Sequence, residues 1–302
     1  MEMKDFRLVA EAVKEALLKE ASQWETKIEV AVQEKKENGN TLVGLSVKDC
    51  AKSVGFLWYL PSGVVDDYLN EPEARECIIH YCVGNIIDYF ENSKVDLVMA
   101  HCGKLLKYEE VKDNIFPVLC SQERCKAELE DVPHRPFLDL AICYRIFTKG
   151  LGMVTGTVLI TKEVMSRYGI DEETLYQKAM ENVRKEFLVE NLLDVMEGRL
   201  EETEPDPTQP QLYVVSKPDK HYGAGAILVK EKLDEIAKEL GVKRFMIFPS
   251  SIHECLITDA TAVDVQSAMF QVRLVNTYEV AEEEILSYSL YYYDVETGYG
   301  KY

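Results

Sequence analysis

Apolar residues recur in two different periods along the chain, and the alternation of these periods predicts a mixed α+β protein. From Lys4 to Gln23 the apolar side chains repeat at helical spacing. From Ile28 to Val47 they alternate with polar side chains on either side of Asn38-Gly39, which predicts a β-hairpin. The helical period returns from Glu73 to Asn92 with a broad apolar face.

A second group of elements follows the segment Val132-Pro-His-Arg-Pro136, because two prolines interrupt regular structure there. The apolar run from Phe137 to Phe147 predicts a buried strand, and Met153 to Ile160 predicts its partner. Thr161 is placed to cap a short helix that ends at Gly169. Asp171, Glu172 and Glu173 then stand at the start of the next helix, where its dipole favours negative charge.

The clearest linker is the acidic, proline-rich stretch from Arg199 to Pro210, which has almost no apolar side chains to bury. Beyond it the pattern predicts the order β-α-β-β-α-β, similar to a split βαβ arrangement, with a last strand from Leu286 to Tyr293. We therefore expect three strand-plus-helix units joined in part by this linker. Their expected ranges are 1–128, 129–200, 201–210 for the linker and 211–302.

The charge of the chain narrows the choice of partner. The 302 residues carry a formal net charge of −19, and the sequence pI is about 4.8. A surface this acidic repels nucleic-acid phosphates and anionic membranes, so we expect neither as a direct ligand. Solubility alone accounts for such a charge in many proteins, and the alternative is a protein partner with a basic face. The N-terminal residues lack the apolar core of a signal peptide, and the apolar runs are shorter than a membrane span, so we expect a cytoplasmic location.

Eight cysteines are present, but no Cys-x-x-Cys pair occurs. We interpret them as ordinary buried or half-buried thiols. The alternative is a zinc site, for which the candidates are Cys77, His80, Cys82, His101 and Cys102. It is disfavoured because helix positions three and five apart do not both face one ligand, so no metal and no cofactor is expected.

The turn within Phe245 to Ile257 brings the side chains of acyl-transfer chemistry together. Ser250, Ser251, His253 and Glu254 lie within five residues of one another. A hydrolase would use Ser251 as the nucleophile with His253 and Glu254, but the segment has no Gly-x-Ser-x-Gly elbow. The other interpretations are a β-turn whose hydroxyls satisfy their own backbone, and a binding role that includes Ser250.

Three further features are candidates for binding. Gly223 and Gly225 precede a helix and either admit a small anionic ligand or form a tight connection. The acidic triplets Asp171 to Glu173 and Glu282 to Glu284 are candidate contact faces for a basic partner. Asp139 is unusual among the apolar residues of its predicted strand, where a strand-end position or a pair with Arg135 or Arg145 would explain it.

Several motifs occur together in an order that resembles a known family. They include Phe248-Pro-Ser-Ser-Ile-His-Glu254, Gly223-Ala-Gly-Ala226, Asp131-Val-Pro-His134 and Tyr168-Gly-Ile-Asp171. Together they resemble a large bacterial domain-of-unknown-function family, found in genomes and mobile elements of anaerobic gut bacteria, with the Pro-Ser-Ser-Ile-His-Glu turn as its most specific motif. The resemblance implies an intracellular α+β protein without an assigned activity. We therefore expect a non-enzymatic interaction protein, an accessory or anti-defence factor of a mobile element, with a Ser/His/Glu hydrolase as the first alternative and an anionic-ligand module as the second.

Overall fold

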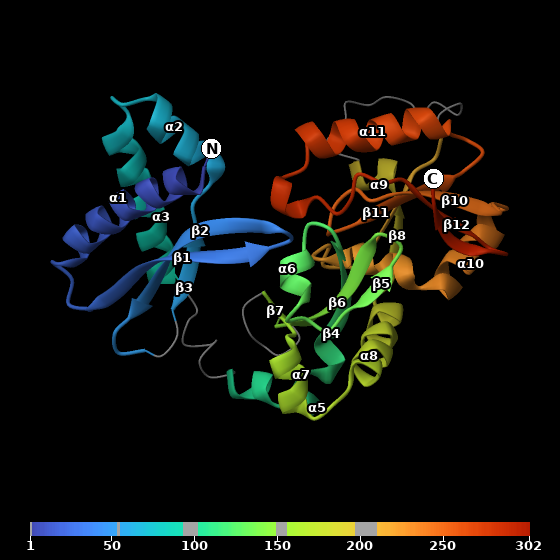
Figure 1. Cartoon of the computed structure of the whole chain (residues 1–302), viewed down its shortest axis with the longest axis horizontal. Coiled ribbons are helices and arrows are strands. Elements are labelled where there is room, and N and C mark those ends of the chain that lie inside the picture. Colours follow the sequence, from blue (N-terminus) through green and yellow to red (C-terminus); the bar gives the residue numbers. More distant parts are fainter. Residues whose placement is uncertain (1, 53–54, 93–101, 149–155, 197–209) are drawn as a thin grey trace. The chain divides into compact units, whose positions relative to one another are not determined.

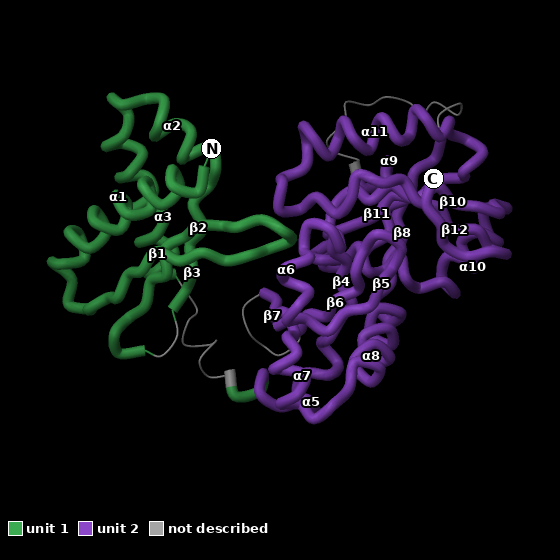
Figure 2. The backbone as a smooth tube through the Cα atoms, viewed as in Figure 1, with its two compact units in different colours: residues 1–104, 152–154 green, residues 105–151, 155–302 purple. Residues whose placement is uncertain are grey.

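The computed structural model describes residues 2–52, 55–92, 102–148, 156–196 and 210–302. Figure 1 shows helices and antiparallel strands interleaved through these residues, which confirms the α+β class. They form two compact units, one of residues 1–104 with 152–154 and the other of residues 105–151 with 155–302 (Figure 2). Unit 1 contains one described sheet, and unit 2 contains two.

In unit 1 the first helix contacts both the sheet and the other two helices. This arrangement follows from its sequence, because Val9, Val13 and Leu17 repeat along one face and are fully buried. The same core receives Val43, Leu45 and Val47 from the second strand. The elements of the unit are α1 (Met3–Ala21), β1 (Ile28–Glu37), β2 (Asn40–Asp49), β3 (Phe56–Tyr59), α2 (Ser62–Asn70) and α3 (Arg75–Asn92).

The predicted hairpin of unit 1 is confirmed. Asn38 and Gly39 join β1 to β2 with φ angles of 48° and 78°, and Glu37 pairs with Asn40 across the turn. A two-residue turn of this kind needs positive φ at both positions, which asparagine and glycine tolerate best.

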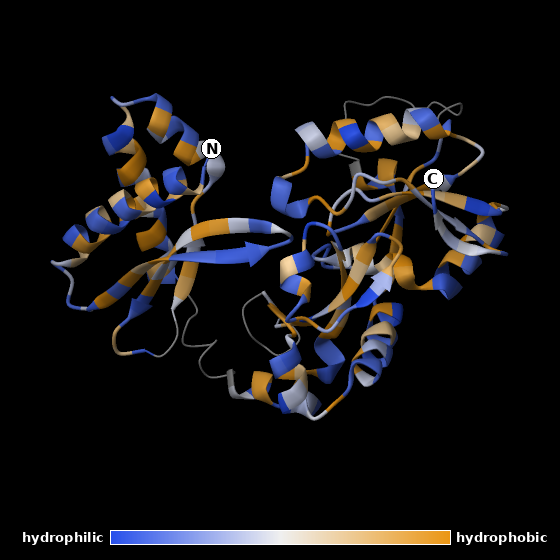
Figure 3. Ribbon diagram, in the orientation of Figure 1, coloured by the Kyte–Doolittle hydropathy of each residue, from blue (hydrophilic) through white to orange (hydrophobic). Residues whose placement is uncertain are grey.

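Unit 2 contains a four-stranded and a six-stranded antiparallel sheet. In the smaller sheet β6 pairs with β4 along most of its length, and with β5 and β7 at its two ends. All eight residues of β6 are buried, and the mostly hydrophobic colouring of this strand is visible in Figure 3. The larger sheet has the order β13-β12-β10-β11-β9-β8.

The strands of unit 2 are short. They are β4 (Ile115–Ser121), β5 (Arg135–Phe137), β6 (Leu140–Phe147), β7 (Thr157–Leu159), β8 (Leu188–Asn191), β9 (Tyr213–Ser216), β10 (Arg244–Phe248), β11 (Cys255–Asp259), β12 (Tyr291–Asp294) and β13 (Gly298–Lys301). The α-helices are α5 (Tyr108–Val111), α6 (Lys126–Leu129), α7 (Lys162–Tyr168), α8 (Glu172–Lys185), α9 (Leu192–Met196), α10 (Lys230–Leu240) and α11 (Val265–Tyr278). Short 3₁₀ turns complete the order: η1 (Cys102–Leu106, at the boundary between the units), η2 (Lys112–Asn114), η4 (Gly223–Leu228) and η5 (Glu282–Glu284).

Both predicted helix starts are confirmed, the first through the expected cap and the second with a cap that the sequence analysis had interpreted only as favourable charge. The Thr161 hydroxyl accepts a hydrogen bond from the Val164 N–H at the start of α7, and this helix ends at Gly169 with φ of 67°. The Asp171 carboxylate accepts from the Thr174 N–H at 2.9 Å and caps α8.

The division of the chain differs from the three expected units. The boundary between the two compact units falls at residues 104 and 105, and not near 128. β8, from the expected central unit, pairs with β9 of the expected C-terminal unit. The split βαβ comparison also needs correction, because such a motif contains parallel strands whereas every pair in the six-stranded sheet is antiparallel. Of the predicted linker, residues 201–209 lie outside the described residues.

Two predicted strands are shorter in the structure. The run from Phe137 to Phe147 breaks at Leu138, whose φ is 57°, so that Phe137 pairs with Leu140 across a tight turn. Asp139 therefore lies in a turn and not inside a strand. The last predicted strand begins at Tyr291 and not at Leu286, and it pairs with β13, which the periodicity did not indicate.

Candidate functional site

The turn from Pro249 to Glu254 connects β10 to β11. Its own backbone donates a hydrogen bond to the hydroxyl of Ser251. The Ser251 Oγ accepts a hydrogen bond from the His253 N–H at 3.0 Å. The Ser251 N–H donates to the Glu254 carbonyl oxygen at 3.2 Å, and the Ser250 N–H donates to the Phe248 carbonyl oxygen at 2.9 Å. This pattern is the self-satisfied turn that serine favours.

The imidazole of His253 is held from two sides. The Tyr222 N–H donates to Nδ1 at 3.0 Å, so this nitrogen carries no proton. The other nitrogen, Nε2, then carries the proton and donates to the Glu284 Oε1 at 3.3 Å. Within the described residues no hydrogen bond joins this ring to the Ser251 hydroxyl or to the Glu254 carboxylate. The geometry therefore gives the Ser251, His253 and Glu254 hydrolase no support.

The glycine segment packs directly against this turn, although the two motifs are separate in sequence. The Ala224 N–H donates to the Ile252 carbonyl oxygen at 3.3 Å. A β-carbon on Gly223 would lie 2.1 Å from the Ser216 Oγ, and one on Gly225 would lie 2.2 Å from the Pro117 carbonyl oxygen. Both glycines are buried in a 3₁₀ turn of six residues. They permit close packing of backbone on backbone, which is the tight-connection interpretation.

Lys217 is a buried cation beside this turn that the sequence analysis did not single out. Its side chain is 1% exposed, and its Nζ lies 2.8 Å from the Asp219 Oδ1. The same Nζ lies 3.7 Å from the ring centroid of Phe147 and 4.9 Å from that of Phe116. Burial lowers the pKa of Lys217 from its ordinary value, against the opposing effect of Asp219.

His221 lies next to His253 and adds a third titratable side chain to Lys217 and His253. Its ring stacks on that of His253 with centroids 5.4 Å apart. Burial, followed by the neighbouring His253, lowers the pKa of His221. The residues on either side of it, Lys220 and Tyr222, have φ angles of 49° and 50°, which are uncommon for side chains with a β-carbon. Lys217, His221 and His253 are therefore titratable groups close to this turn. Lys217 already pairs with Asp219, and His253 already pairs with Glu284, within the same chain.

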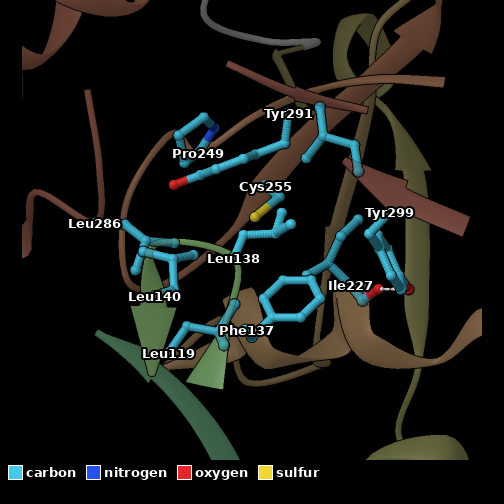
Figure 4. Close-up of a pocket in the computed structure, with 11 residues that line it drawn as sticks. Leu119, Phe137, Leu138, Leu140, Ile227, Pro249, Cys255, Leu286, Tyr291 and Tyr299 are labelled. Atoms are coloured by element: carbon cyan, nitrogen blue, oxygen red, sulfur yellow. Dashed lines mark hydrogen bonds between the residues drawn. The ribbon is translucent and has the colours of Figure 1, made fainter. Parts of the chain in front are cut away.

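A pocket lies behind the Pro249 turn, and its lining is apolar (Figure 4). Figure 4 shows the Cys255 sulfur in its wall, near the side chains of Leu138 and Tyr291. Burial raises the pKa of Cys255 to about 12, so this thiol is a poor nucleophile at neutral pH. The Tyr299 hydroxyl donates to the Ile227 carbonyl oxygen in the same wall. The pocket therefore adds no reactive group to the turn.

The acidic triplets are engaged within unit 2. Asp171 caps α8, and the Arg135 Nε–H lies 2.8 Å from both carboxylate oxygens of Glu172, to which it donates a bifurcated hydrogen bond. Glu173 also pairs with Arg135. In the second triplet, Glu284 is the partner of His253. These contacts leave the triplets as weaker candidates for a partner face than the sequence indicated.

A different acidic surface lies on α2, α3 and the residues between them, which we call the acid–tyrosine face. Two tyrosines of α3 are exposed, Tyr81 at 63% and Tyr89 at 55%. The only Lys or Arg residue between positions 62 and 92 is Arg75, whose Nε donates to the Tyr68 carbonyl oxygen and whose guanidinium lies over the Tyr68 ring. None of the seven carboxylates of the face forms an ion pair in the part of the chain that the structure describes. They are all exposed: Asp66, Asp67, Glu71, Glu73, Glu76, Asp88 and Glu91.

The zinc-site alternative receives no support from the described residues. Among them no group of three or more His, Cys, Asp or Glu side chains is placed to hold a metal ion. Of the candidate zinc ligands, Cys77 is exposed and Cys82 is buried, while His101 lies outside the described residues. No helix in the described ranges is both long and apolar enough to cross a membrane.

Replacing Ser251 by alanine should lower the free energy of unfolding by about 0.5–2 kcal/mol, because the His253 N–H loses its acceptor. Ser250→Ala is the matched control, since the described structure contains no hydrogen bond to its hydroxyl, and it should be nearly neutral. Chemical denaturation of both variants measures the difference. An unchanged stability of Ser251→Ala together with loss of a hydrolytic activity would instead support catalysis.

Comparison with known proteins places most of the chain in one family. Residues 6–295 match a family described as "Family of unknown function (DUF5688)". No curated protein and no solved structure gives a significant match.

Proposed function

The chain belongs to DUF5688, a family without an assigned activity, and we propose that it is a non-enzymatic interaction protein that binds a protein partner with a basic surface. The observation that supports this proposal is the acid–tyrosine face of unit 1. Seven exposed carboxylates without ion-pair partners in the described structure are carried by α2, α3 and the residues between them, and α3 also carries the exposed Tyr81 and Tyr89. Such a face complements lysine and arginine in charge.

The two tyrosines give the face a feature that solubility does not require. Tyr81 and Asp88 are seven residues apart on α3, so they lie two turns apart on the same side of the helix. Exposed tyrosine is enriched in protein interfaces, and an arginine can stack on its ring while it pairs with a neighbouring carboxylate. Charge alone is enough for solubility, whereas exposed tyrosines next to charge are what a binding face would use.

The acid–tyrosine face also differs from the acidic triplets of unit 2. Glu172 and Glu173 already share Arg135, so a partner would have to displace an existing ion pair. The carboxylates at Asp67, Glu71 and Asp88 have no such competitor among the described residues. The role of an accessory or anti-defence factor of a mobile element is part of the same proposal, since such factors act by binding other proteins.

Affinity capture from a lysate of the native host, with identification by mass spectrometry, tests the proposal. The face variant carries Asp67→Lys, Glu71→Lys and Asp88→Lys. The control variant carries Glu15→Lys, Glu20→Lys and Glu25→Lys, three exposed carboxylates of the same unit. Each variant changes the formal net charge by six, from −19 to −13.

The wild type and the control variant should each retain a basic protein in a stoichiometric amount. The face variant should not retain it. Capture that is equal for all three proteins, or equally reduced in both variants, would show that overall charge and not this face determines binding. Circular dichroism of both variants checks that unit 1 stays folded.

A further inference from the structure

Three cysteines of unit 2 lie together, two in the four-stranded sheet and one at the start of α6. Cys120 lies on β4 and Cys143 on β6, with their sulfur atoms 3.7 Å apart. Cys125, at the start of α6, also shares a hydrogen bond with Cys120. Cys120 is therefore the central thiol of three in a row, which we call the thiol cluster.

The sheet register explains why the sulfur atoms meet. Cys120 pairs with Ala141, and Val118 pairs with Cys143. Residues 118 and 120 point to the same side of β4, so Cys120 and Cys143 are diagonal neighbours on one face of the sheet. The backbone of two paired strands thus holds the Cys120 and Cys143 thiols in contact.

Exposure distinguishes the central thiol from its neighbours. Cys125 is 2% exposed and Cys143 is 4% exposed, whereas Cys120 is only half-buried. Among the other described cysteines, Cys50 and Cys77 are exposed. The structure shows sulfur–sulfur contact only within the thiol cluster, as far as the described residues extend.

We propose that the thiol cluster is an oxidation site, at which peroxide converts Cys120 and one of its two neighbours into a disulfide. In the first step the Cys120 thiolate attacks one oxygen of hydrogen peroxide. The O–O bond breaks, Cys120 becomes a sulfenic acid, and the expelled hydroxide takes up the proton that the Cys120 thiol lost on ionising, so that one water is released. In the second step the neighbouring thiol attacks the Cys120 sulfur, the S–O bond breaks, and a second water leaves as the disulfide forms.

The geometry favours the disulfide over deeper oxidation. The sulfur atoms of Cys120 and Cys143 must approach by about 1.7 Å, from 3.7 Å to the bond length of about 2.05 Å. Neighbours in contact on both sides would capture the sulfenic acid before a second peroxide reaches it. A metal site is not the better explanation, because the described residues contain no group arranged to hold a metal.

The reaction should be slow at neutral pH and faster at higher pH. Burial and the hydrogen bond to Cys143 raise the pKa of Cys120 well above its ordinary value, although the hydrogen bond from Cys125, the largest single effect, lowers it. Only the thiolate attacks peroxide, so raising the pH increases the reactive fraction.

Peptide mapping of the peroxide-treated full-length protein tests the proposal. The reduced protein is freed of reductant, treated with hydrogen peroxide, alkylated in denaturant and digested without reduction for mass spectrometry. We expect one disulfide per chain, with Cys120 as one half, while Cys50 and Cys77 are recovered alkylated. Cys120→Ala should abolish this disulfide, and the double variant Cys125→Ala with Cys143→Ala should leave a sulfenic acid at Cys120 that dimedone labels.

The wild-type map decides the question even where a variant folds poorly. A chain that stays fully reduced would overturn the proposal. So would a disulfide that lacks Cys120, or sulfinic acid at Cys120 in the wild type. Denatured protein treated in the same way is the control, and it should give mixed disulfides without preference for Cys120.

Discussion

Replacing Asp139 by asparagine should lower the free energy of unfolding by about 2 kcal/mol at neutral pH, because three donors lose a charged acceptor. The Tyr291 hydroxyl donates to the Asp139 Oδ1 at 2.6 Å, and the Ser289 hydroxyl and Lys301 Nζ donate to Oδ2 at 2.7 and 2.9 Å. These contacts join the turn between β5 and β6 to the last two strands of the larger sheet. The expected loss is smaller than the sum of three charged hydrogen bonds, because the carboxylate is partly exposed to water.

The effect of Asp139→Asn should also depend on pH. Burial alone would raise the pKa of Asp139, but the hydrogen bonds from Tyr291, Lys301 and Ser289 outweigh it and hold the pKa below the ordinary value of 3.8. A carboxyl with a lowered pKa in the folded state stabilises the protein above its unfolded pKa and loses this effect as the pH falls through the folded pKa. The difference between wild type and variant should therefore shrink below about pH 4.

Urea denaturation at about pH 7 and about pH 3 measures both parts of this prediction. Tyr291→Phe removes one donor and leaves the carboxylate, so a double-mutant cycle of the two positions isolates their contact. Equal stability of wild type and Asp139→Asn at neutral pH would contradict the assignment, as would a difference that stays constant with pH.

Gly225→Ala should lower the free energy of unfolding by about 3 kcal/mol, because the new β-carbon would lie 2.2 Å from the Pro117 carbonyl oxygen. That oxygen belongs to the backbone of β4 and cannot move without disturbing the sheet. Gly84→Ala is the matched control, since its β-carbon would meet no atom within 4 Å and it lies in the middle of α3. The control should gain up to about 1 kcal/mol from higher helix propensity.

Thermal denaturation with and without inorganic phosphate separates close packing from anion binding at this glycine segment. Close packing predicts a lower melting temperature for Gly225→Ala and no effect of phosphate on the wild type beyond its general salt effect. A normal melting temperature for the variant, with a phosphate-dependent rise in the wild type that the variant lacks, would favour the anionic-ligand module.

Local signals in the sequence were sufficient to predict many single helices and turns. They were not sufficient to predict which strands pair. Asn38-Gly39, Thr161 and Asp171 each satisfy a backbone requirement of their own turn or helix, so each predicts its element without tertiary information. Leu138 has no such signal, because a leucine with φ of 57° is held by the surrounding structure and not by its own preference. The apolar run from Phe137 therefore predicted one strand where the structure has two.

The candidate site shows the same limit. The sequence placed Ser251 and His253 in one turn, but the partner that fixes the imidazole, the Tyr222 N–H, lies 31 residues away. Lys217 lies against Phe116 and Phe147, which are distant from it in sequence. The residues next to Lys217 in the sequence therefore gave no indication that it is buried. The thiol cluster depends on the register between β4 and β6, and sequence spacing does not encode that register.

The affinity for the captured partner, compared between the wild type and the two variants at low and high salt, tests the central proposal most directly. The measurement is the Kd of the captured partner for the wild type, the face variant and the control variant at about 50 mM and about 300 mM salt, across which charge interactions at a surface are progressively screened. The proposal predicts that the face variant binds at least about tenfold more weakly than the control variant at low salt, and that the wild type loses affinity steeply at high salt. Equal Kd values for the two variants, or a wild-type Kd that does not change with salt, would contradict it.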